Sequence, residues 1–199
     1  MIRVKSNWFK AGREKTPQEL AGAMAFIAWR IAENMLKNLR RADFEIAVGP
    51  QYFAFLTEFL IFIVQVADRI AYQRMDGEQR VLFTSTLANR VANNLAENQQ
   101  RLLACDLAGC KEDFINHLNG RSEDYAEFEF DAHGPSFAFL RYFAHSLLEH
   151  LDEKDRHWVS DQIMAIEAPE AVSTVEKAMR GLLETEPRTR RAGSASGAD

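Results

Sequence analysis

The sequence contains few cysteines. Its 199 residues include only two, Cys105 and Cys110. Two cysteines cannot form the disulfide framework of a small secreted domain, and their spacing matches no zinc signature. If both residues lay on one helix, a separation of five would point their side chains in different directions. We therefore expect two reduced thiols with a structural role.

The sequence also lacks a long hydrophobic run. The longest, residues 59–64, is far shorter than the roughly 20 apolar residues that a membrane-spanning helix needs. Glu58 and Gln65 flank this run directly, and the N-terminus has no apolar stretch typical of a signal peptide. We expect no membrane span and a cytoplasmic location.

Motifs for common catalytic chemistry are missing as well. The sequence has no glycine-rich phosphate-binding pattern and no Glu-x-x-His motif of the kind that holds two metal ions in helical bundles. Glu33, Glu97 and Glu149 fall on polar helix faces, where solvation accounts for them. His145 and Glu149 have the i, i+4 spacing of an ordinary surface pair. We therefore predict no catalytic residue, no metal site and no cofactor.

A strong positive charge is also absent. The net charge at pH 7 is −5, from 24 basic and 29 acidic residues. A nucleic-acid-binding domain normally presents a basic face, so we expect no nucleic-acid partner. Basic residues gather in the first fifteen positions, whereas positions 123–131 are acidic.

Helical periodicity, in contrast, runs through most of the chain. Residues 16–19 read Thr-Pro-Gln-Glu, a helix start with an N-cap, a proline at the first helical position and a capping-box glutamate. Apolar residues then recur every three or four positions to about residue 41. The same periodicity predicts helices over residues 50–75, 78–104, 111–118, 136–151, 155–166 and 170–184. Only residues 127–131 alternate with a period of two, which is typical of an extended segment.

These patterns predict an all-α bundle of about six to seven helices. We expect one domain over residues 16–185, an N-terminal arm at residues 1–15 and a disordered tail at residues 186–199. The helix over residues 50–75 is the most apolar, with Phe53, Phe59, Ile63 and Ile70 on an arc wider than half its circumference. A helix of this kind contacts several neighbours, so we place it at the centre of the bundle.

Polar residues on otherwise apolar helix faces suggest a ligand pocket. Asn94 and Asn98 fall on the narrow apolar seam of the third helix, where they either fix the helix register or line a pocket. Gln65, Asp68 and Arg69 lie with Glu58 on the polar arc of the central helix. These side chains either form an internal ion-pair network or line the same pocket.

A second candidate site lies on the first helix. Gly22, Phe26 and Trp29 fall on its outer arc, where aromatic side chains beside a small residue are typical of a helix–helix interface. These residues either pack beneath the N-terminal arm through Trp8 and Phe9, or form a contact with a second copy or another protein.

Three functions remain open at this level. We expect first a non-catalytic interaction or regulatory protein, a homodimer that binds another macromolecule. The alternative is a small-molecule sensor or carrier with a pocket inside the bundle. A metal-dependent helical enzyme is the third.

Overall fold

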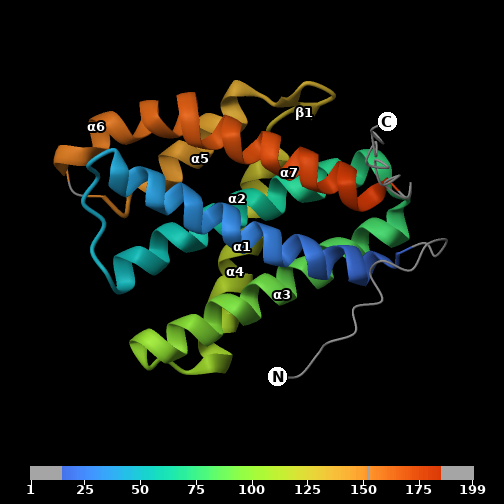
Figure 1. The fold of residues 1–199 in the computed structure, drawn as a ribbon, viewed down its shortest axis with the longest axis horizontal. Helices are drawn as coiled ribbons and strands as arrows, with labels where there is room; N and C mark the ends of the chain where they lie inside the picture. Colours follow the sequence, from blue (N-terminus) through green and yellow to red (C-terminus); the bar gives the residue numbers. More distant parts are fainter. Residues whose placement is uncertain (1–14, 152, 185–199) are drawn as a thin grey trace, which may run out of the picture.

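The computed structural model describes residues 15–151 and 153–184, and it is an all-α bundle (Figure 1). The expected arm and tail lie almost entirely outside the described residues. The helices are α1 (Pro17–Arg41), α2 (Pro50–Arg74), α3 (Gly77–Leu103), α4 (Leu107–Ala126), α5 (Phe137–Leu148), α6 (Glu153–Gln162) and α7 (Ala168–Leu183). The fold class predicted from the sequence is confirmed.

Helix α1 begins where the local sequence predicts. The Thr16 hydroxyl accepts a hydrogen bond from the Glu19 backbone N–H at 3.2 Å, and the Glu19 carboxylate accepts one from the Thr16 N–H at 3.0 Å. This reciprocal pair satisfies two of the backbone donors left free at the first turn of a helix. Pro17 at the first helical position lacks the N–H that would otherwise need a partner.

The central helix is α2. It packs against α1, α3, α4, α5 and α7, and residues on every side of it are buried. Phenylalanines from α2 and α5 contact one another in the core of the bundle. The Phe62 ring stacks on Phe143 at a centroid distance of 4.0 Å, and Phe59 lies edge-on to Phe143 at 5.9 Å. These rings join α5 to the centre of the bundle.

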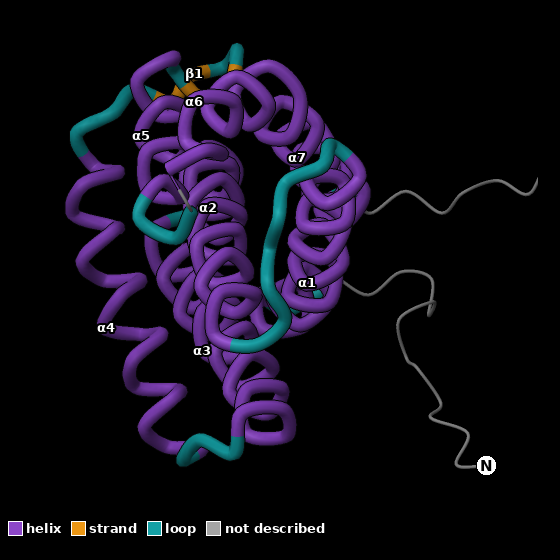
Figure 2. Tube along the Cα trace, turned by 90° about the vertical axis from the view of Figure 1, so that its left-hand side faces the viewer, coloured by secondary structure: helices purple, strands orange, loops and turns teal. Residues whose placement is uncertain are grey.

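Helices α3 and α4 form the part of the bundle that positions the site. Only residues 104–106 separate them, so α4 packs back along α3 and also contacts α2. Figure 2 shows α4 along the outer side of the bundle, next to α2 and α3. The sequence predicted a helix only over residues 111–118, ended by Asn119 and Gly120. That prediction was wrong, because α4 continues through both residues to Ala126.

The last two helices are continuous rather than separate. The sequence predicted a break at Ala168 and Pro169, but a π-helical turn, Ile163–Glu167, joins α6 to α7. Glu167 is buried in this turn and accepts hydrogen bonds from Asn38 at 3.1 Å and from Gln162 at 3.0 Å. Pro169 falls in the first turn of α7, where its missing N–H is tolerated.

Within the described residues, strand structure is limited to a short hairpin. Phe130–Asp131 (β1) pairs antiparallel with Gly134–Pro135 (β2), so the extended segment expected near residue 130 has a partner that the sequence did not reveal. Gly134 has a φ of 100°, a backbone conformation that favours glycine. In the part of the chain that the structure describes, no helix is both long and apolar enough to cross a membrane.

Candidate functional site: a cavity beside Glu58

A cavity of about 340 Å³ lies between α2, α3 and α4. Its walls are mostly apolar, and its polar residues include one buried carboxylate, Glu58 of α2. The lining residues are Pro50, Phe53, Ala54, Thr57 and Glu58 from α2, Leu95, Gln99 and Leu103 from α3, Cys110, Asp113, Phe114 and His117 from α4, and His150 after α5. Apolar walls with a few convergent polar groups are typical of small-molecule sites.

Glu58 is the centre of a polar cluster in this cavity. Its side chain is only 2% exposed. Oε1 accepts a hydrogen bond from Arg121 Nη2 at 2.7 Å and lies 2.7 Å from His117 Nε2. His150 Nε2 lies 3.7 Å from the same oxygen, beyond hydrogen-bond distance but within range of an electrostatic interaction. Three nitrogen atoms, two from α4 and one from the residues after α5, thus point at one carboxylate oxygen.

This cluster keeps Glu58 ionised. Burial by itself raises the pKa of the carboxyl, but the interactions with His117, His150 and Arg121 outweigh burial and hold the pKa well below its usual value. An ionised carboxylate only accepts hydrogen bonds, so the facing nitrogen of His117 must carry the hydrogen.

The cluster continues to the surface through Arg121. Burial by itself lowers the pKa of the guanidinium. The hydrogen bonds to Glu58 and Tyr142 outweigh burial and raise the pKa above its ordinary value, so Arg121 stays charged. Arg121 Nη1 donates to the Tyr142 hydroxyl at 3.0 Å, and this hydroxyl donates to Asp124. A charged hydrogen-bonded chain therefore links the buried carboxylate to an exposed one.

The local structure explains why these side chains meet. His117 and Arg121 are one turn apart on α4, so they face α2 together. His150 follows the end of α5, where its backbone carbonyl accepts a hydrogen bond from Gln51 Nε2 at 2.8 Å. The His117 side chain is 41% exposed, so the cluster can be reached from solvent.

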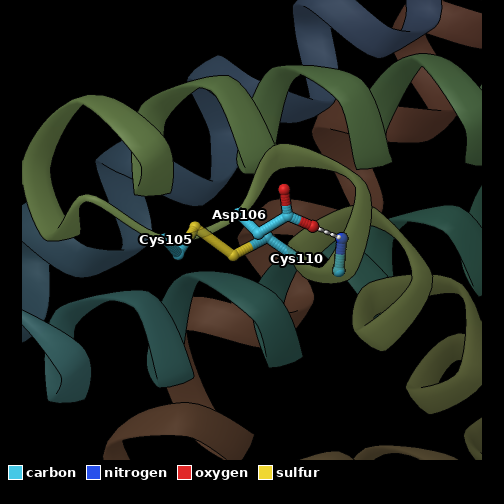
Figure 3. Close-up of a disulfide and its surroundings, with 4 residues drawn as sticks. Cys105, Asp106 and Cys110 are labelled. Carbon is cyan, nitrogen blue, oxygen red and sulfur yellow. Dashed lines mark hydrogen bonds between the residues drawn. A yellow bond between two sulfur atoms is a disulfide. The ribbon is translucent and has the colours of Figure 1, made fainter.

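The two cysteines form a disulfide at this cavity, and the expectation of reduced thiols was wrong. Figure 3 shows the Cys105–Cys110 bond at the connection between α3 and α4. Helix α3 ends at Leu103, so the two residues do not share a helix, and their Cα atoms lie 6.7 Å apart, within reach of a disulfide. Asp106 caps α4 by accepting a hydrogen bond from the Gly109 N–H at 2.7 Å.

Three residues predicted to line a pocket instead connect helices. The Gln65 amide donates to the Ser122 hydroxyl at 2.6 Å, and Arg69 donates to the Tyr125 carbonyl at 2.7 Å. Asp68 accepts two hydrogen bonds from Arg80, at 3.0 and 2.6 Å. None of the three lines the cavity beside Glu58.

Asn94 and Asn98 are half-buried on α3 and interact along their own helix. Asn98 Nδ2 donates to the Asn94 carbonyl at 2.7 Å, and Arg101 donates to the Asn98 side chain. The cavity is lined instead by their neighbours Leu95 and Gln99. The five residues predicted for a pocket are therefore spread over two helices and are not brought together at this cavity.

The three residues predicted for an interface lie on α1 in different surroundings. Phe26 is 63% exposed, and the Arg30 guanidinium lies 5.9 Å from its ring centroid. Trp29 is partly buried against the core, whereas a Cβ at Gly22 would lie 3.3 Å from Arg90 Cζ on α3. The suggested packing with Trp8 and Phe9 involves positions outside the described residues.

Sequence reasoning missed most of the Glu58 cluster. Glu58 stood out in the sequence as an acid beside the longest apolar run. His117, however, lay next to the end of the helix predicted over residues 111–118, and Arg121 lay beyond that end. A longer α4 would have placed both on one face.

Comparison with known proteins does not assign the site. No protein-family model, curated protein or solved structure matches this chain. Within residues 15–151 and 153–184, no group of three or more His, Cys, Asp or Glu side chains is placed to hold a metal ion.

Proposed function

We propose that this protein binds a small organic molecule in the cavity beside Glu58, as a sensor or carrier. The observation that carries the proposal is the combination of a cavity of about 340 Å³ with a buried, ionised carboxylate in its lining. Apolar walls supply the driving force for burying a ligand, and the carboxylate supplies orientation and specificity.

Filling the cavity tests this proposal. Ala54 is half-buried and lines the cavity, so Ala54→Leu adds side-chain volume where a ligand would lie. We expect at least about tenfold weaker binding of the neutral fluorescent probe N-phenyl-1-naphthylamine, because the probe and the added side chain compete for one space. Fluorescence titration of the purified variant measures this loss.

Ala178→Leu is the matched control. Ala178 is a half-buried alanine on α7 that does not line this cavity. This variant should bind the probe as the unchanged protein does. Equal probe affinity in Ala54→Leu and Ala178→Leu would contradict binding in the cavity.

The exposure of Phe26 favours a second function, binding of a protein partner through α1. Large aromatic side chains are enriched at interface centres, and a phenylalanine that is 63% exposed leaves apolar surface to bury. We expect a homodimer that Phe26→Ala dissociates, because this side chain can be removed without opening the core.

The mass of the purified protein in solution shows whether it is the expected dimer. Native mass spectrometry should give a dimer for the unchanged protein and a larger monomer fraction for Phe26→Ala at the same concentration. Phe137→Ala is the control, since Phe137 is similarly exposed on α5. A monomer before substitution, or an equal dimer fraction in both variants, would contradict this interface.

A further inference from the structure

We propose that the cavity is selective for an organic cation, a primary ammonium group carried on a compact apolar or aromatic body. This inference rests on the small-molecule function proposed above and specifies the class of ligand. The charges of the lining, its unpaired acceptors and its aromatic walls support it.

The acidic side chains that line the cavity outnumber the basic side chains paired with them. Among the residues that the structure describes, the cavity is lined by two carboxylates, Glu58 and Asp113, and by neither a lysine nor an arginine. Arg121 contacts Glu58 but does not line the cavity, so it balances only one of the two acids. The second acid, Asp113, has no cation among the described residues of the lining, and an organic cation is the ligand that balances it.

The hydrogen-bonding groups point to a donor ligand. The hydrogen bonds that described residues make with Glu58 use Oε1, which leaves Oε2 available as an acceptor. The side-chain oxygen of Gln99 is buried and has no hydrogen-bond partner in the described part of the chain, and Gln99 also lines the cavity. A buried acceptor without a partner is unfavourable, so a ligand that donates to these oxygens gains affinity.

A primary ammonium group satisfies this arrangement. It carries a positive charge and three N–H donors, whereas a carboxylate ligand would add acceptors to a lining that already has a surplus. A second buried side-chain atom without a partner among the described residues is a donor, Arg121 Nε, but Arg121 does not line the cavity.

The apolar walls select the rest of the ligand. Phe53 and Phe114 are buried and line the cavity with Leu95. Aromatic rings attract cations as well as apolar groups, which reinforces the preference for an amine with an aromatic body. A volume of about 340 Å³ is near the lower end of the range for ligand pockets, so the body must be compact.

Three compounds that share one body and differ in the terminal group test this preference. They are 2-phenylethylamine, 2-phenylethanol and phenylacetate, titrated at pH 8, where the amine is a cation and the acid is an anion. Displacement of N-phenyl-1-naphthylamine from the purified protein measures each affinity. We expect the amine to bind at least about tenfold more tightly than the alcohol, and phenylacetate to bind most weakly.

Asp113→Asn isolates the charge effect. Asp113 is exposed, so removing its charge leaves the core unchanged. We expect this variant to lose several-fold of the ratio between amine and alcohol affinity. Glu58→Gln, examined at a temperature where it is folded, should reduce the ratio further, because its carboxylate is the buried acceptor.

The outcomes separate this proposal from the function on which it rests. If the probe binds but phenylacetate displaces it as well as the amine does, or none of the three compounds displaces it, the cation preference is wrong and small-molecule binding stands. An unchanged ratio in Asp113→Asn also overturns the preference. If Ala54→Leu binds the probe normally, the cavity is not the ligand site and both proposals fail.

Discussion

Glu58→Gln is expected to lower the free energy of unfolding by about 3 kcal/mol at pH 7, because it leaves a partly buried guanidinium without its counter-charge. Breaking a buried ion pair by removing one partner typically lowers stability by about 3–5 kcal/mol. The lower end applies here because Arg121 is 17% exposed and the amide can still accept one hydrogen bond. Urea-induced unfolding at pH 7 measures the change.

The same carboxylate makes stability depend on pH. Its pKa in the folded protein lies below the ordinary value of 4.5, so the folded state favours the ionised form. This contribution to stability is fully present well above pH 4.5 and is lost as the pH falls from there toward the lower pKa of the folded state. Glu58→Gln should therefore lose less stability than the unchanged protein between pH 6 and pH 3.

Asp68→Asn is the matched control on the same helix. Asp68 pairs with Arg80, whose side chain is 35% exposed, so solvent weakens the interaction. Pairs near the surface contribute roughly 0–1 kcal/mol, and this variant should fall near that range despite its additional hydrogen bond from Thr84. If Glu58→Gln lowered stability no more than Asp68→Asn does, the Glu58 cluster would not be a buried ion pair in solution.

Phe62→Ala is expected to lower the free energy of unfolding by about 3–5 kcal/mol, because it opens a space at the centre of the bundle. Phe62 is fully buried, stacks on Phe143 at 4.0 Å and lies edge-on to Phe139 at 6.0 Å. For a protein of this length, the loss corresponds to a decrease in Tm of about 10 °C. Thermal unfolding followed by circular dichroism measures it.

Tyr72→Ala removes an aromatic ring from the exposed side of the same helix. Tyr72 is an exposed residue whose ring lies 4.9 Å from the Arg80 guanidinium carbon, so its loss should change stability by about 1 kcal/mol or less. Equal effects of Phe62→Ala and Tyr72→Ala would mean that α2 is not the core helix of the folded protein.

The helices were the most predictable part of this structure, because their signals are local. The capping box at Thr16 and Glu19 predicted the start of α1, and the wide apolar arc from Phe53 to Ile70 predicted the burial of α2. The prediction failed where a local signal disagreed with the tertiary packing. Asn119 and Gly120 resemble a helix end, yet packing of α4 against α2 and α3 carries the helix through them.

The sequence by itself determined the all-α class and the central position of α2, since the spacing of apolar residues along a helix decides which face is buried. Only the tertiary structure decided that Glu58 meets His117, Arg121 and His150, residues 59 to 92 positions further along the chain. Such a meeting depends on how three segments cross and on where α4 ends, and residue spacing within any one helix carries no information about either. The Cys105–Cys110 disulfide has the same origin, because it required α3 to end at Leu103 and the chain to turn before α4.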